Sequence, residues 1–270
     1  MWLPARYGFA IAAAAGTLAP LVARRPFRAL SPAHNETLRA TLSEVAVVST
    51  LYGLWQYSGR IPRLGVSPAL DRARWIVDAQ QAVHLPSEKV LQTLILPHPW
   101  IVQAANWYYL LMHVPALGAA LVWVFFAHRP HYRLLRNALA LTTLLCLLTQ
   151  LIPVAPPRLL PELGYVDTAL KYNQSVYGLL GRGGLAGQVS AMPSIHVAWA
   201  AIVSWIGLTV PTRRWIKTIC VAHCVLTVTV VAATANHFWM DGIVAVMYLA
   251  IAITVLWRVR DPQGEPYVHR

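Results

Sequence analysis

Long apolar runs are the feature that most constrains how this chain can fold. Six runs are close to the roughly 20 residues that a helix needs to cross a bilayer. They cover residues 40–58, 100–127, 134–152, 194–210, 215–234 and 237–257. Only 12% of the residues are charged and 57% are hydrophobic, whereas soluble domains carry about 25% charged residues. The sequence therefore predicts an all-α fold, a polytopic membrane helix bundle with six core transmembrane helices.

Two other segments complete the predicted organisation. Residues 7–23 form a shorter apolar run, which we leave open as a signal-like anchor, an extra N-terminal span or an interfacial segment. Residues 71–96 alternate charged and apolar residues at helical spacing, which predicts a pair of amphipathic interfacial helices divided by Pro86. The chain is thus expected to have an N-terminal segment (1–39), a transmembrane domain (40–260) and a polar C-terminal tail (261–270).

The net charge of +12 does not form a surface for nucleic acid, because the basic residues lie at the ends of apolar runs. Clusters occur within residues 24–28, 129–136, 213–217 and 258–260. Lys and Arg near spans mark the cytoplasmic side of a membrane. We therefore predict that the long 153–193 connection and the short 235–236 turn lie on the extracytoplasmic face, in the plasma membrane.

The sharpest chemical signal is the pair His237 and Asp241 at the start of the last run. Ionisable residues in apolar runs are functional candidates. Four residues apart on a helix, the two side chains would stack about 6 Å apart along the axis. The carboxylate could accept the Nδ1 proton of the imidazole and leave Nε2 as a nucleophile or base. A purely structural pair is the alternative. The neighbouring Asn236 is expected to line the pocket of this site.

A second histidine opens the 194–210 run. Pro193 and Ser194 are typical helix-start residues, and the N–H groups of such a start favour an anion. His196 follows within the first turn. Because this run crosses the membrane and the next one returns, His196 and His237 are expected at the same membrane face.

Basic residues of the 153–193 connection could bind a phosphate at that face. Arg158 follows the end of the 134–152 run and could bind phosphate oxygens through two parallel hydrogen bonds. An interfacial anchor is the equal alternative for this side chain. Lys171 and Arg182 are weaker phosphate-binding candidates in the same connection.

In the 100–127 run, Tyr109 and His113 lie one helical turn apart. They could line a pocket, or they could form hydrogen bonds between helices, and the sequence leaves both interpretations open.

These motifs resemble the type 2 phosphatidic acid phosphatase (PAP2) superfamily over about residues 106–257. Residues 193–196 match its second motif, and His237 and Asp241 match its third. The Pro-Pro-Arg stretch at 156–158 and the six-span layout resemble the inositol phosphorylceramide synthase-like branch. The resemblance is incomplete at three positions. Leu151 stands where the family has the Lys of its first motif, and Leu159 stands where a Pro follows the Arg of that motif. Val231 stands where the family has the Arg of its third motif.

The resemblance implies a membrane enzyme that moves a phosphate-linked headgroup from a phospholipid to an alcohol acceptor, a lipid or a glycolipid. It implies His237 as the nucleophile that forms a phosphohistidine, Asp241 as its orienting carboxylate and His196 as acid and base. Arg158 and Ser194 would hold phosphoryl oxygens. No cofactor and no metal is implied, and the expected partners are a lipid phosphate substrate and membrane lipids.

Two alternatives remain from the sequence, which does not indicate an oligomeric state. One is a hydrolytic phosphatase of lipid or prenyl phosphates, which would use the same histidines with water as acceptor. The more distant one is a membrane transporter with an intramembrane His/Asp relay. A transporter of that kind predicts inverted internal repeats, and none is visible in the sequence.

Overall fold

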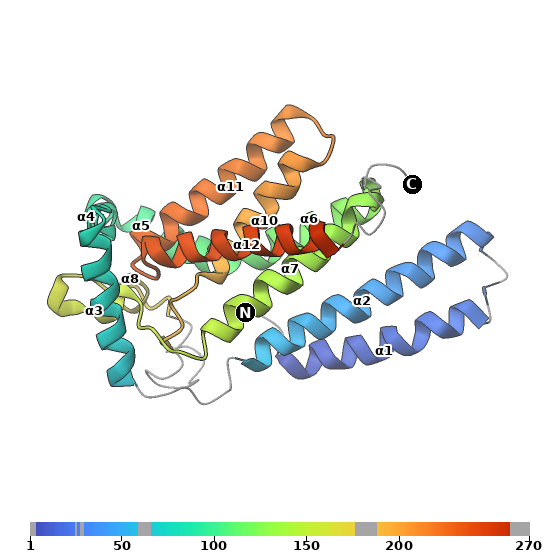
Figure 1. Cartoon of the computed structure of the whole chain (residues 1–270), viewed down its shortest axis with the longest axis horizontal. Helices are drawn as coiled ribbons and strands as arrows, with labels where there is room; N and C mark the ends of the chain where they lie inside the picture. The colour runs from blue at the N-terminus through green and yellow to red at the C-terminus, as the bar shows by residue number, and fades with distance from the viewer. Residues whose placement is uncertain (1–3, 25, 28–29, 59–65, 176–187, 260–270) are drawn as a thin grey trace. The chain divides into compact units, whose positions relative to one another are not determined.

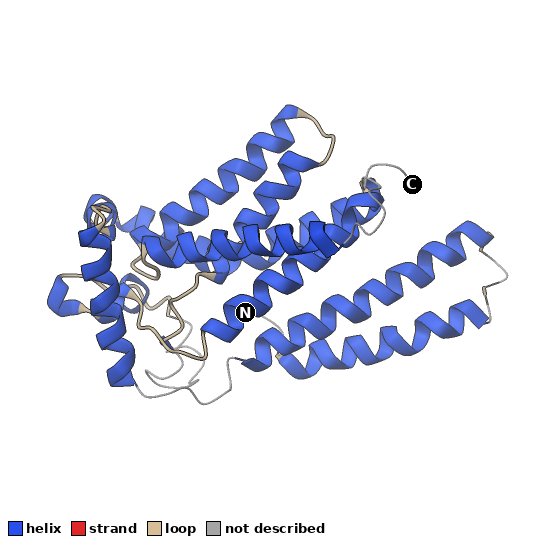
Figure 2. Cartoon of the chain, in the orientation of Figure 1, coloured by secondary structure: helices blue, strands red, loops and turns tan. Residues whose placement is uncertain are grey.

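The computed structural model describes residues 4–24, 26–27, 30–58, 66–175 and 188–259 of the chain. Within these residues every long element is a helix, and the connections are loops and short 3-10 turns (Figure 2). In the same described part, strand-like pairing is limited to an isolated parallel bridge between Val154 and Ser190. The predicted all-α class is confirmed.

The first of two compact units, residues 1–61, is a helical hairpin of α1 (Ala5–Arg24) and α2 (Pro32–Ser58). Small residues on α1 allow close approach: a Cβ atom on Gly8 would lie 3.1 Å from the Ser49 carbonyl oxygen of α2. Because residues 32–58 form one continuous helix that packs against α1, the boundary predicted after residue 39 falls inside α2.

The second unit, residues 62–270, holds the remaining helices (Figure 1). Its apolar helix α10 packs against both α11 and α12, and α12 also lies against α7. In chain order the helices are α3 (Val66–Ala82), α4 (Glu88–Ile95), α5 (Pro99–Leu111), α6 (His113–Ala127), α7 (Arg129–Thr149), α8 (Thr168–Lys171), α10 (Ile195–Thr209), α11 (Arg214–Ala233) and α12 (Trp239–Val259).

Three helices of the described chain, α1, α11 and α12, are long and apolar enough to cross a membrane. The bent pair α5 and α6 makes a fourth if it is one span. The count of six core spans is therefore not confirmed. The run predicted at 194–210 is the shorter apolar helix α10, and the run predicted at 134–152 lies in α7, where Arg133, Arg136 and Asn137 lower the mean hydropathy. The run at 40–58 lies in the more polar α2.

The break between α5 and α6 bends the 100–127 run by 49°. Proline has no N–H, so Pro115 cannot donate to the carbonyl of Leu111, the last residue of α5. The bend separates Tyr109 from His113, which starts α6.

The predicted amphipathic pair is present as α3 and α4, separated at Pro86. The two helices bury different kinds of residue. On α3 the buried face is mainly apolar, with Ala73 and Ile76, whereas the buried residues of α4 are Glu88 and Gln92. Trp75 of α3 and Leu94 of α4 are 68% and 65% exposed, so each helix also turns a large apolar side chain outward.

Candidate active site

The short turn between α11 and α12 shapes the site. Ala235 has a left-handed φ of 53°. Its N–H donates to the Ala232 carbonyl at 2.9 Å, and the Asn236 N–H donates to the Val231 carbonyl at 3.0 Å. This pair of hydrogen bonds is the Schellman pattern, which ends a helix and satisfies its last carbonyls. The chain therefore leaves α11 sharply and enters α12 within a few residues.

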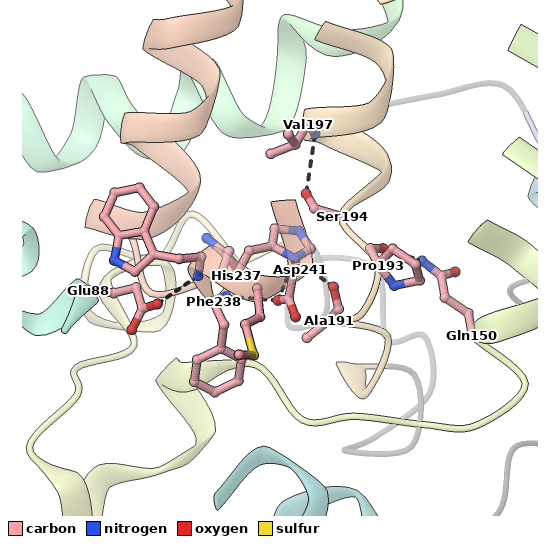
Figure 3. Close-up of polar contacts among 12 residues, drawn as sticks. Glu88, Gln150, Ala191, Pro193, Ser194, Val197, His237, Phe238 and Asp241 are labelled. Carbon is pink, nitrogen blue, oxygen red and sulfur yellow. Dashed lines mark hydrogen bonds and ion pairs between the residues drawn. The ribbon is translucent and has the colours of Figure 1, made fainter. Parts of the chain in front are cut away.

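His237 lies in this turn, two residues before α12, so the expectation that it sits on the helix is wrong. The helix begins at Trp239, because the Asp241 carboxylate accepts the Phe238 N–H at 2.8 Å and so caps the helix there (Figure 3). The predicted proximity to Asp241 still holds, since Nδ1 of His237 lies 3.3 Å from Oδ2 of Asp241.

The hydrogen bonds of His237 determine which of its nitrogens carries the proton. Nδ1 also lies 2.8 Å from the Ala191 carbonyl oxygen. Both neighbours of Nδ1 are acceptors, so Nδ1 carries the proton and Nε2 carries the lone pair. Nε2 is buried and has no hydrogen-bond partner among the described residues. The imidazole therefore presents an unengaged lone pair, as a nucleophile requires.

Asp241 also connects α12 to α10. Its side chain is fully buried, and its backbone carbonyl accepts the Ser194 N–H at 3.1 Å. Ser194 is the N-cap residue of α10, where its hydroxyl accepts the Val197 N–H at 3.3 Å (Figure 3). The helix start that carries His196 is thus fixed to the helix start that carries Asp241.

His196 is the second residue of α10 and faces His237, with 5.6 Å between the ring centroids. Tyr109 stacks on its ring at 4.3 Å, and His113 meets it edge-on at 4.4 Å. Nδ1 of His196 is buried without a hydrogen-bond partner in the described part of the chain. Two of the residues predicted to line a pocket, Tyr109 and His113, therefore contact His196 from both sides of the α5/α6 bend.

Arg158 is 7% exposed, and its guanidinium donates to side chains of described residues on several sides. Its Nη1 donates to Asp167 at 2.9 Å and to Gln188 at 2.7 Å, and its Nε donates to Asn236 at 3.1 Å. Its backbone N–H donates to the Ala235 carbonyl at 2.9 Å. Asn236, which immediately precedes His237, therefore fixes the guanidinium beside the His237 turn.

No described contact joins the other two phosphate-binding candidates, Lys171 and Arg182, to the site around His237. Lys171 is exposed at the end of α8, with its ammonium 5.6 Å from the ring centroid of Tyr172. Arg182 lies outside the described residues.

Polar residues that no sequence pattern predicted surround the site. A small cavity beside Arg158 is lined by Tyr109, Asn236, Asn106 and Gln174, among others. Asn106 donates to Gln174 at 2.8 Å and accepts the Thr168 hydroxyl at 2.9 Å. A carboxamide in an apolar run was the available signal for Asn106. Gln174 lies in a loop and Thr168 begins the short helix α8, both in a connection where polar residues are ordinary, so no pattern could single them out.

A second group of missed residues comes from α3 and α4. Glu88 accepts the Trp239 N–H at 2.7 Å, and Gln80 accepts the Met240 N–H at 3.0 Å. The signal for Glu88 was weak, because a glutamate after Ser87 is an ordinary helix-start residue.

Comparison with known proteins agrees with this geometry. The family model of the PAP2 superfamily matches residues 74–255, which extend from α3 through most of α12 and include both histidines, Arg158 and Asp241. No curated protein and no solved structure matches the chain. Since the matched residues make up more than half of the sequence, the chain belongs to the PAP2 superfamily.

Proposed function

We propose that this chain is a membrane lipid phosphotransferase or phosphatase that works through a phosphohistidine on His237. PAP2 superfamily members carry out phosphoric ester chemistry, which supports an enzyme of that class. The observation that carries the specific proposal is His237 itself: Nδ1 is held by two acceptors, and Nε2 is unengaged beside a second histidine.

In the first half-reaction, Nε2 of His237 attacks phosphorus and the bond from phosphorus to the leaving oxygen breaks. His196 donates a proton to that oxygen, which departs as an alcohol. In the second half-reaction, an acceptor hydroxyl gives its proton to His196 and attacks phosphorus. The bond between phosphorus and nitrogen then breaks and restores His237. Arg158 and the Ser194 hydroxyl would bind the phosphoryl oxygens, and Asp241 would stabilise the imidazolium.

The donor is a phospholipid whose headgroup stays on phosphorus, and the acceptor is an alcohol on a lipid or glycolipid, in line with the inositol phosphorylceramide synthase-like layout of the sequence. A hydrolytic lipid or prenyl phosphate phosphatase is the second candidate, because water could replace the acceptor at the same residues. Polar groups beside Arg158, including Asn106 and Gln174, favour a hydroxyl-bearing acceptor or headgroup, since amides bind hydroxyls in both directions.

We also propose that the site lies on the extracytoplasmic face of the plasma membrane. The basic segments 129–136 and 213–217 would be cytoplasmic under the positive-inside rule. The proposal takes one crossing in the second half of α2 and five more in the segments from the α5/α6 pair to α12. The helix ends that carry Arg158, His196 and His237 then lie on the face opposite the two basic segments.

The test is a set of single substitutions in purified protein, His237→Ala, His196→Ala and, as the matched control, His98→Ala. His98 is exposed and makes no side-chain capping bond. Turnover of a labelled phospholipid should vanish in His237→Ala and fall by about 10²–10⁴-fold in His196→Ala, while the control keeps its rate. Product masses identify the acceptor, and unchanged turnover in His237→Ala would refute the proposal.

An aryl phosphate separates the two histidine roles, because its phenolate leaves without a proton. With this substrate, His196→Ala should again form an acid-labile phosphoenzyme. The breakdown of this phosphoenzyme should stay slow, because no base activates the acceptor. His237→Ala should form none with either substrate. Failure of the aryl phosphate to rescue His196→Ala would remove the general-acid assignment.

A further inference from the structure

The first turn of α12 depends on acceptors from distant parts of the chain. The first N–H groups of a helix have no partner within the helix. Here Asp241 accepts the Phe238 N–H, but the Trp239 and Met240 N–H groups donate to the side chains of Glu88 and Gln80. Glu88 and Gln80 lie 151 and 160 residues away in sequence, on α4 and α3. Helices α3 and α4 therefore complete the cap of the helix that follows His237, and Figure 3 shows the hydrogen bond accepted by Glu88.

Glu88 is itself held in one orientation. Its side chain is fully buried. Oε1 accepts from Gln80 at 2.9 Å as well as from Trp239, and Oε2 accepts the Tyr165 hydroxyl at 3.1 Å. Burial raises the pKa of the Glu88 carboxyl above its usual value, and its hydrogen-bond donors oppose that rise. A buried carboxyl group is costly unless its oxygens are satisfied, and here both oxygens are occupied.

These bonds fix the position of the backbone that supports the nucleophile. Trp239 is two residues after His237, and Asp241 is two residues after Trp239, so a shift of Trp239 moves the imidazole relative to the carboxylate that faces it. No described hydrogen bond joins Glu88 to the side chain of His237 or Asp241, so Glu88 acts through the Trp239 N–H. We propose that Glu88, with Gln80, is a positioning residue for His237, so that α3 and α4 set the geometry of phosphoryl transfer; this rests on the function proposed above.

The decisive comparison is between two conservative variants of Glu88. Glu88→Gln keeps the length of the side chain and an oxygen to accept the Trp239 N–H, but it removes the charge. Glu88→Asp keeps the charge but withdraws the carboxylate by one methylene. Positioning predicts that Glu88→Gln keeps kcat within about threefold of wild type, whereas Glu88→Asp lowers kcat by about 10–100-fold with little change in KM. Glu162, an exposed glutamate paired with Arg74, provides the matched controls Glu162→Gln and Glu162→Asp.

Single-turnover kinetics distinguish positioning from loss of folded protein. A smaller folded fraction lowers the amplitude of the phosphoenzyme burst, whereas a misplaced His237 lowers its rate constant. In Glu88→Asp we expect the rate constant of the burst to fall. The amplitude of the burst should match the folded fraction measured by thermal unfolding. Should Glu88→Asp not fold, Gln80→Met removes the acceptor for the Met240 N–H without a change in charge and should lower the same rate constant about threefold or more.

A wild-type rate constant in Glu88→Asp, or equal losses in Glu88→Asp and Glu88→Gln, would overturn the inference. His237→Ala is run alongside. If His237→Ala retains turnover, the proposed function fails whatever the Glu88 variants do. If His237→Ala is inactive and Glu88→Asp has the wild-type rate, only the positioning inference fails.

Discussion

Asp241→Asn should weaken catalysis without abolishing it, because Asp241 is one of two acceptors for Nδ1 of His237. The Ala191 carbonyl lies at 2.8 Å and the Asp241 carboxylate at 3.3 Å. After the substitution, the carbonyl still keeps the proton on Nδ1 and the lone pair on Nε2. What is lost is the negative charge beside the imidazolium that forms during phosphoryl transfer.

The expected loss follows from the contribution of a hydrogen bond to a charged group, about 1.5–3 kcal/mol. At about 1.4 kcal/mol for each factor of ten in rate, this corresponds to a fall in kcat of roughly 10–150-fold. The long 3.3 Å separation favours the lower end of this range. Stability should change little, because the carboxamide oxygen introduced by Asp241→Asn can still accept the Phe238 N–H, whereas Asp241→Ala also removes that cap at a cost of about 1 kcal/mol.

The assay is steady-state turnover of the same labelled phosphate substrate, normalised to folded protein, with thermal unfolding measured in parallel. Asp78→Asn is the matched control, since Asp78 is exposed on α3. If Asp241→Asn were as inactive as His237→Ala, the Ala191 carbonyl would not be holding the tautomer. If Asp241→Asn had the wild-type rate, the carboxylate would have no part in catalysis.

Four further predictions concern stability, topology and metal dependence. Burial raises the pKa of Glu88, so its contribution to stability is full below the unfolded pKa and lost as the pH rises through the folded pKa; thermal unfolding measured as the pH rises from the unfolded pKa of glutamate should show a decline that Glu88→Gln removes. Gly207→Ala should destabilise the protein by about 1–3 kcal/mol, because its Cβ would lie 2.6 Å from a cysteine sulfur on α11, whereas Gly118→Ala, with nothing within 4 Å, should not. Of single cysteines placed at Gly183 and Pro211 in a cysteine-free background, only the first should react with an impermeant thiol reagent on intact cells; the reverse would invert the topology. Turnover should survive EDTA, since side chains neutralise the phosphate, and a strict need for added divalent metal would contradict this.

The apolar runs and the local motifs were visible in the sequence because both depend on short spacings. Runs of apolar residues predict helices, and the structure is helical at each of them. His237 and Asp241 are four residues apart, so they meet whether His237 begins the helix or precedes it. The motif residues 193–196 predicted a helix start, and α10 does begin there, with Ser194 as its N-cap. The catalytic roles of these residues remain predictions.

The number of spans was less predictable, because composition does not show where a helix bends or how polar its ends are. One apolar run became α5 and α6, which meet at 49°, and Pro115 supplies the reason. Another run became α7, which carries arginines within its first turns. The helix begins at Arg129, so its mean hydropathy includes arginines that the apolar run alone leaves out, whereas a bend inside an apolar run does not change the hydropathy of that run.

By itself, the sequence determined that this is a helical protein with apolar helices, that it carries PAP2 motifs and that His237 and Asp241 lie together. Only the tertiary structure decided the contacts that hold His237 in place. The Ala191 carbonyl that binds Nδ1 is 46 residues away, and Glu88, which caps the following helix, is 151 residues from its partner. Periodicity and motif spacing report on neighbours within a few turns of chain. Contacts across such separations arise from how loops and helices pack, and no local pattern encodes them.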